Sequence, residues 1–145
     1  MKRIILTFVA LTLAVATAGA EDKIAATLYK IPGCLCCDWY ANYLRSNGFE
    51  VKVVESRNMT LIRNQQGVPG TLAGCHTTVV GGYVVEGHVP ITAVKRLLDE
   101  KPAIKGISLP GMPEGSPGMT GTKKAPFTVF AIPNDGSATS IFATE

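Results

Sequence analysis

Three cysteines within four residues, Cys34, Cys36 and Cys37, restrict the possible structures of this chain more than any other feature. They follow a β-prone run at residues 27–31, and a helical pattern of apolar residues covers residues 37–47. The unpaired N–H groups and the dipole at the start of a helix favour negative charge, which lowers the pKa of a cysteine there. The sequence therefore predicts reactive thiolates at the start of the first helix, suited to binding a metal or attacking a disulfide.

Alternating strand and helix patterns continue through the first two thirds of the chain. Residues 49–54 alternate apolar and polar side chains as a half-buried strand does, and residues 59–66 form a second helical segment. A hairpin with a two-glycine turn is predicted at residues 77–85, and a third helix at residues 90–100. The order β-α-β-α-β-β-α, with a cysteine motif after the first strand, predicts an α/β thioredoxin-like domain over residues 21–102.

The remaining residues, 103–145, are predicted to form an irregular extension rich in Pro, Gly and Met. Residues 109–119 are dense in Pro and Gly, and residues 127–132 are read as one last strand. Met112 and Met119 lie in the irregular part and carry soft thioether donors. We therefore expect the extension to pack on a metal site.

The first twenty residues are typical of a cleavable signal peptide. Lys2 and Arg3 precede an uncharged apolar stretch at residues 4–15, and Ala18-Gly19-Ala20 matches the small-residue pattern of a cleavage site. The apolar stretch is shorter than the roughly 20 residues of a membrane-spanning helix; an uncleaved N-terminal anchor is the alternative. We expect residues 1–20 to direct export to the bacterial periplasm, with no membrane contact after cleavage.

The charge of the expected mature chain is nearly balanced. Without Lys2 and Arg3, 12 of the 14 basic residues remain against 11 acidic ones. No run of Lys or Arg marks a nucleic-acid or lipid surface. We therefore expect a protein that has no nucleic-acid partner, and we expect it to be a monomer.

The cysteine spacing bears on two kinds of chemistry. Cys34 and Cys37 have the Cys-x-x-Cys spacing of a dithiol oxidoreductase, in which Cys36 would be superfluous. Several thiolates this close can instead bridge metal ions, and Cys75-His76, just before the hairpin, would add a thiolate and an imidazole. Thiolate and thioether ligands select Cu(I), whereas imidazole suits copper and zinc alike. Copper is the predicted metal; a zinc site and metal-free thiol chemistry are the alternatives.

Several candidate ligands also have a purely structural interpretation. Cys75 could be a buried apolar residue, and His76 could cap a loop. His88, at the end of the hairpin, is either a ligand or a surface histidine. Met112 and Met119 are either thioether ligands or packing residues. Four further residues are expected in the core or in a pocket wall: Trp39, Tyr40, Tyr43 and Met59.

Together these motifs resemble the CopG-like periplasmic copper-resistance proteins, which have a thioredoxin-like domain. The resemblance extends from about Tyr29 to Met119. Its motifs are Cys34-Leu-Cys-Cys37, Gly67-Val-Pro69, Cys75-His-Thr-Thr-Val-Val-Gly-Gly-Tyr-Val-Val-Glu-Gly-His-Val-Pro90 and Leu109-Pro-Gly-Met-Pro-Glu-Gly-Ser-Pro-Gly-Met119. It implies a multinuclear Cu(I)/Cu(II) cluster bridged by cysteine sulfurs, with a contribution from the C-terminal extension. The implied ligands are Cys34, Cys36, Cys37 and Cys75, followed by His88, Met112 and Met119, with His76 as a further candidate.

The resemblance also implies a role in copper tolerance. Such a protein would interconvert Cu(I) and Cu(II), as a copper oxidoreductase, or carry copper to a periplasmic efflux system. The alternative function is a periplasmic thiol-disulfide oxidoreductase that uses Cys34 and Cys37.

Overall fold

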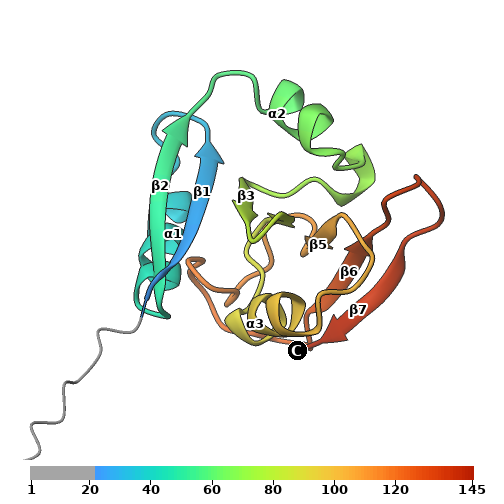
Figure 1. Cartoon of the computed structure of the whole chain (residues 1–145). Helices are drawn as coiled ribbons and strands as arrows, with labels where there is room; N and C mark the ends of the chain where they lie inside the picture. The colour runs from blue at the N-terminus through green and yellow to red at the C-terminus, as the bar shows by residue number, and fades with distance from the viewer. Residues whose placement is uncertain (1–21) are drawn as a thin grey trace, which may run out of the picture.

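A computed structural model describes residues 22–145, which form a mixed α/β fold (Figure 1). Within this range one seven-stranded sheet has the strand order β2-β1-β3-β4-β5-β6-β7, and three α-helices accompany it. Across the same residues no helix is both long and apolar enough to cross a membrane. The predicted signal peptide, residues 1–20, lies outside the described part of the chain.

The first strand, helix and second strand form a parallel βαβ unit. Strand β1 (Ile24–Lys30) pairs in parallel with β2 (Phe49–Glu55), and α1 (Leu35–Arg45) connects them. Cys34 is the extended N-cap residue of α1, so the helix begins two residues before the predicted start. The cysteine motif therefore forms the first turn of α1, at the carboxyl end of β1.

A second helix and a hairpin continue the sheet. Helix α2 (Met59–Gln66) has the predicted bounds, because Asn58 accepts a capping hydrogen bond from Leu61 N–H and Gly67 ends the helix in the left-handed conformation. A short 3₁₀ turn (Gly70–Leu72) leads to β3 (Thr77–Val80) and β4 (Tyr83–Glu86). Strand β3 is antiparallel to both β1 and β4, which places the residues before β3 beside the end of β1.

Helix α3 (Ile91–Glu100) is followed by an extension that is more regular than predicted. Strand β5 (Gly106–Ser108) pairs with β4, and β6 (Thr128–Ile132) and β7 (Ser140–Thr144) complete the sheet at the edge opposite β2 (Figure 1). The expectation of an irregular extension with one strand is therefore wrong for β5 and β7. Both are short, and β5 is buried on both faces, so neither has the clear alternation that marks a strand in sequence.

Two apolar clusters cover opposite faces of the sheet. Val85 packs in the larger cluster with α1 and α3, whereas its neighbour Val84 packs in a smaller cluster with the segment after α2. Met59 and Tyr40 are buried as predicted, but Trp39 is 48% exposed and not in the core. Tyr40 directs its ring inward, and Trp39, one position away on the helix, lies about 100° around the helix axis from it.

Candidate metal centre

The sulfur atoms of all four cysteines meet at the start of α1. Cys75 Sγ lies 3.3 Å from Cys34 Sγ, 3.4 Å from Cys36 Sγ and 3.4 Å from Cys37 Sγ. Cys75 thus contacts all three cysteines of the helix from the opposite side, on the segment before β3. The structure brings together the four sulfur ligands that the sequence predicts.

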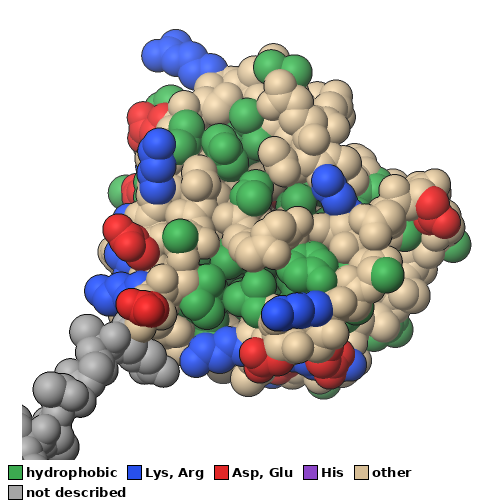
Figure 2. Space-filling view, viewed as in Figure 1, with side chains coloured by type: hydrophobic (Ala, Val, Ile, Leu, Met, Phe, Trp, Pro, Cys, Tyr) green, Lys and Arg blue, Asp and Glu red, His purple; other side chains and the backbone are tan. Residues whose placement is uncertain are grey.

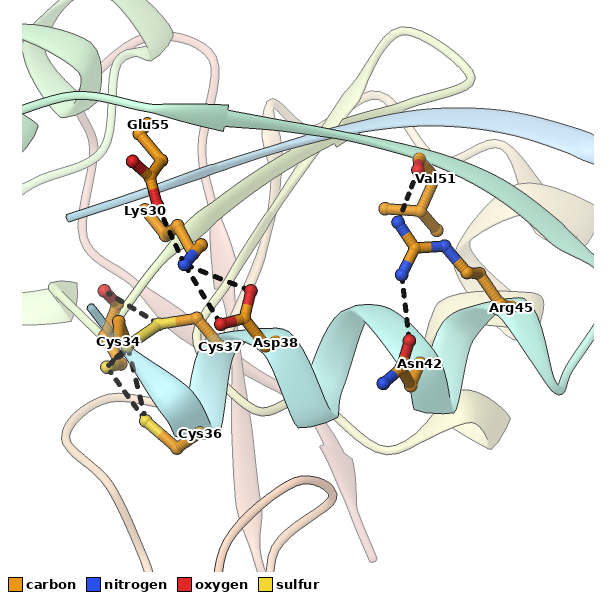
Figure 3. A network of polar contacts seen from close by, with 10 residues as sticks. Lys30, Cys34, Cys36, Cys37, Asp38, Asn42, Arg45, Val51 and Glu55 are labelled. Atoms are coloured by element: carbon orange, nitrogen blue, oxygen red, sulfur yellow. Dashed lines mark hydrogen bonds and ion pairs between the residues drawn. A yellow bond between two sulfur atoms is a disulfide. The ribbon is translucent and has the colours of Figure 1, made fainter. Parts of the chain in front are cut away.

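The three α1 cysteines differ in oxidation state and exposure. Cys34 and Cys37 form a disulfide, whereas Cys36 and Cys75 are free thiols. Figure 3 shows the three cysteines of α1 grouped at its first turn. Cys37 is fully buried, whereas Cys34 is half-buried. Reduction of the disulfide would give four thiols at one place.

Two buried histidines lie next to the sulfur atoms. His76 and His88 are both 0% exposed, and their rings meet edge to face with centroids 4.7 Å apart. Neither ring reaches the surface seen in Figure 2. One ligand atom from each of Cys75, His76 and His88 lies within 4.8 Å of the others. His88 is therefore no surface histidine.

Three of the four ring nitrogens of these histidines have no hydrogen-bond partner among residues 22–145. Nδ1 of His88 is 2.7 Å from the carbonyl oxygen of Pro117, so this nitrogen donates and Nε2 carries a free lone pair. Among residues 22–145 no group hydrogen-bonds Nε2 of His88 or either ring nitrogen of His76. His76 therefore does not cap a loop through its ring. Buried polar atoms are costly without a partner, so the site favours an additional ligand there.

The irregular segment of the extension packs against the N-terminal half of α1. Gly118 lies so close that an added Cβ would stand 2.8 Å from Tyr40 N and 2.9 Å from Cys36 O. Met119 follows Gly118 and is half-buried, whereas the Met112 side chain is 56% exposed. The segment thus packs on the cysteine motif through its backbone. Of the two methionines, Met119 is the one next to the contacting residue, Gly118.

Comparisons with known proteins assign this arrangement to a family. Two solved structures, "Copper resistance protein copG- Form 2" and "Form 1", superimpose with TM-scores of 0.78 and 0.77. Each is 33% identical to this chain, covers 85% of it and is itself covered to 98%. The chain belongs to the CopG family of copper resistance proteins. A profile described as "Protein of unknown function, DUF411" matches residues 72–119, and no curated protein matches.

Burial sets the protonation of the ligands in this CopG-family site. It lowers the pKa of His76 well below 6.5, with further repulsion from His88 and Arg63, and it also lowers the pKa of His88. Both imidazoles are therefore neutral near pH 7, which is the form that binds metals. Burial and the neighbouring Cys36 raise the pKa of Cys75 to about 12, so metal binding must displace the proton of this thiol.

Tyr40 forms the wall behind the histidines, as predicted for a pocket residue. Its ring centroid lies 4.5 Å from that of His76 and 5.5 Å from that of His88. Its hydroxyl donates to the carbonyl oxygen of Val89 at 2.9 Å, so it leaves the histidine nitrogens free. Burial raises the pKa of Tyr40, which stays a neutral donor.

Two ion-pair networks that hold the site were not predicted. Lys30, buried at the end of β1, donates to Asp38 and Glu55 and ties the first turn of α1 to β2 (Figure 3). Burial lowers the pKa of Lys30, but its hydrogen bonds to the two carboxylates outweigh this and raise it. The second network joins Arg63 on α2 to Glu86 on β4. Each network joins residues at least eight positions apart, and none of the five residues has a local pattern that would mark it.

Proposed function

We propose that this chain is a periplasmic copper-binding protein that acts in copper resistance. The observation that carries the proposal is the meeting of four cysteine sulfurs with two buried imidazoles, three of whose four nitrogens have no hydrogen-bond partner among residues 22–145. Sulfur selects Cu(I), and imidazole suits Cu(II) as well as zinc. The two similar structures are copper resistance proteins, which supports copper over zinc.

Copper in such a site would supply reversible one-electron exchange. Cys34, Cys36, Cys37 and Cys75 would hold several Cu(I) ions in a sulfur-bridged cluster once the disulfide is reduced. His76 and His88, neutral and adjacent to Cys75, would favour Cu(II). This mixed donor set supports interconversion of Cu(I) and Cu(II); handing copper as cargo to an efflux system would use the same ligands.

The surrounding fold and cellular location belong to the same proposal. The order of the first seven elements, with the cysteine motif at the start of α1, supports a thioredoxin-like domain that the extension completes. The signal-peptide pattern of residues 1–20 supports export to the periplasm. Copper found with the protein in the cytoplasm of copper-fed cells, and not in the periplasmic fraction, would contradict this location.

The disulfide favours a second candidate function, thiol-disulfide exchange. Once reduced, Cys34 is the more accessible of the pair and would attack a substrate disulfide. Cys37 would then attack the Cys34 sulfur of the mixed disulfide and expel the second substrate thiol. This step leaves the substrate as two thiols and forms the Cys34–Cys37 disulfide again. An external dithiol would have to return the two electrons for each further turnover.

One set of measurements separates the two functions. Reduced protein is loaded without oxygen with Cu(I) or Zn(II), desalted and analysed for metal, next to Cys36→Ser. The copper proposal expects more than one copper per chain and a clear loss in Cys36→Ser. Insulin reduction that survives Cys36→Ser and a chelator, but not Cys34→Ser, would favour thiol-disulfide exchange.

A further inference from the structure

Glu86 and Arg63 form a buried ion pair on the face of the sheet opposite α1. The Glu86 carboxylate is 0% exposed, and its Oε1 accepts from Arg63 Nε at 2.8 Å. The same oxygen accepts from the backbone N–H of Gly74 at 2.8 Å, and Oε2 accepts from Thr77 Oγ1 at 2.6 Å. Arg63 also donates from Nη2 to the carbonyl oxygen of Gly74 at 2.8 Å. Two of these four bonds end on Gly74, in the segment between α2 and β3, and a third ends on Thr77, the first residue of β3.

This segment carries two of the candidate copper ligands. Gly74 and Thr77, the residues that the ion pair holds, directly flank Cys75 and His76. The backbone is fixed further because Gly87 N–H donates to the His76 carbonyl oxygen at 2.9 Å. The two ligand residues are thus fixed on both sides, which limits where the Cys75 sulfur can move.

The segment also packs too closely against the hairpin to be shifted easily. A Cβ added to Gly74 would stand 2.6 Å from Gly87 Cα and 2.9 Å from Gly87 N. Only a glycine at position 74 permits this approach, because both nearby atoms belong to the backbone. Glu86 and Arg63 therefore hold a backbone that the packing has already brought into one position.

Stability alone is a weak reason for such a pair. Burying two charges costs solvation energy, and apolar residues of similar volume are often as stabilising. A guanidinium has a rigid fork of donors, and here it bonds the carboxylate and the Gly74 carbonyl at the same time. Directional bonds of this kind orient the residues that ligate a metal.

We propose that Arg63 and Glu86 are positioning residues of the copper site, which hold residues 74–77 so that Cys75 and His76 face the cysteines of α1. This role rests on the proposed copper function. The ion pair would then affect copper affinity although it lies on the face of the sheet opposite α1.

Two conservative substitutions test the role. Arg63→Lys keeps the charge but loses the fork, and Glu86→Gln keeps the size but loses the charge. The exposed pair Arg96–Glu100 offers matched controls, since Arg96 Nε donates to Glu100 at 2.9 Å and Nη1 to the Phe142 carbonyl oxygen at 3.0 Å. Arg96→Lys and Glu100→Gln thus make the same chemical changes at the surface.

The readouts are Cu(I) affinity, from competition with a chromophoric Cu(I) chelator, and the thiolate-to-copper absorption spectrum. Both are measured below the unfolding temperature of each reduced apo variant. We expect Arg63→Lys and Glu86→Gln to bind Cu(I) roughly 10- to 100-fold more weakly, as for other residues that orient metal ligands, with a changed spectrum. The Arg96 and Glu100 variants should match the wild type.

A merely structural role would lower the unfolding temperature and leave the affinity and spectrum of the folded protein unchanged, which would overturn the proposal. If both variants fail to fold, Thr77→Val removes a single bond to Glu86 and should still weaken Cu(I) binding; wild-type affinity there would also overturn it. If the wild type binds no copper, the proposed function itself fails, and this inference fails with it.

Discussion

The two sides of the metal centre are built in different ways. On one side, Cys34, Cys36 and Cys37 lie within four residues at the start of α1, and sulfur is their only donor atom. On the other side, Cys75 and His76 precede β3, and His88 follows β4, so the hairpin brings a thiol and two imidazoles together. We call these the helix side and the hairpin side.

The difference extends to how each side is anchored. The helix side is tied down by Lys30, whose partners Asp38 and Glu55 are 43% and 53% exposed in their side chains. The hairpin side is anchored by Glu86, which is completely buried. The helix side can change covalently, as its disulfide shows, while Cys75 stays a free thiol. We infer that the hairpin side is the fixed half of the site and that the helix side is the half whose cysteines change oxidation state.

The largest expected effect comes from Cys75→Ser. Cys75 Sγ contacts all three sulfurs of the helix side, so its loss should remove every sulfur–sulfur contact between the two sides. We expect Cu(I) affinity to fall by at least roughly 100-fold, beyond the range for residues that only orient ligands. Copper analysis and chelator competition provide the measurement. A smaller loss than in Cys36→Ser would show that the helix side binds copper on its own.

His88→Gln should affect Cu(II) more than Cu(I). The substitution removes the free Nε2 of the hairpin side and leaves all four sulfurs in place. We expect Cu(II) binding to weaken by about 10-fold or more, since imidazole suits Cu(II) and thiolates retain Cu(I). Electron paramagnetic resonance would show weaker nitrogen coupling to copper, because His76 still supplies one imidazole. Thr78→Val, which removes a buried β3 hydroxyl that has no partner among residues 22–145, is the control and should retain the signal.

Gly118→Ala tests the close contact between the extension and the helix side. Gly118 has φ +80° and touches the backbone of α1, whereas Gly136 has φ +72° with nothing near its Cβ position. Both substitutions should cost about 1–2 kcal/mol for the left-handed backbone. Gly118→Ala should cost about 1–3 kcal/mol more for overpacking. Chemical denaturation measures this difference, and equal losses would contradict the close contact.

The pH dependence of stability should be the smallest effect. Because the pKa of His76 in the folded protein lies below 6.5, the unfolded chain takes up a proton first as the pH falls. The reduced apo protein should therefore lose stability below about pH 6.5, by up to about 1.4 kcal/mol per pH unit for each buried histidine. His76→Phe should flatten the profile in urea denaturation at pH 5–7. An unchanged slope would show that His76 is not kept neutral by burial.

The sequence predicted the helix side better than the hairpin side. The helix side depends on local signals, namely cysteine spacing, the Pro32-Gly33 stop and the start of α1, and these appear in the structure within two residues. The fourth thiol, Cys75, required the added assumption that the residues before β3 lie beside the start of α1. The antiparallel pairing of β3 with β1 brings them there.

What the sequence could not show depends on distant contacts. Glu86 occupies a strand position where a surface carboxylate is usual, and its burial depends on bonds from Arg63 on α2, from Gly74 N–H and from Thr77. The Cys34–Cys37 disulfide, by contrast, is local and joins the two cysteines that have the Cys-x-x-Cys spacing in the sequence. Trp39 fits an apolar helical pattern, yet the buried face of α1 is centred on Tyr40 and Leu44.

The most direct test of the copper site is X-ray absorption at the copper edge, on protein isolated from copper-fed cells. The account predicts more than one copper per chain, mainly sulfur neighbours and a smaller nitrogen contribution that decreases in His88→Gln. Stoichiometric zinc in place of copper, or copper with only oxygen and nitrogen neighbours, would contradict it.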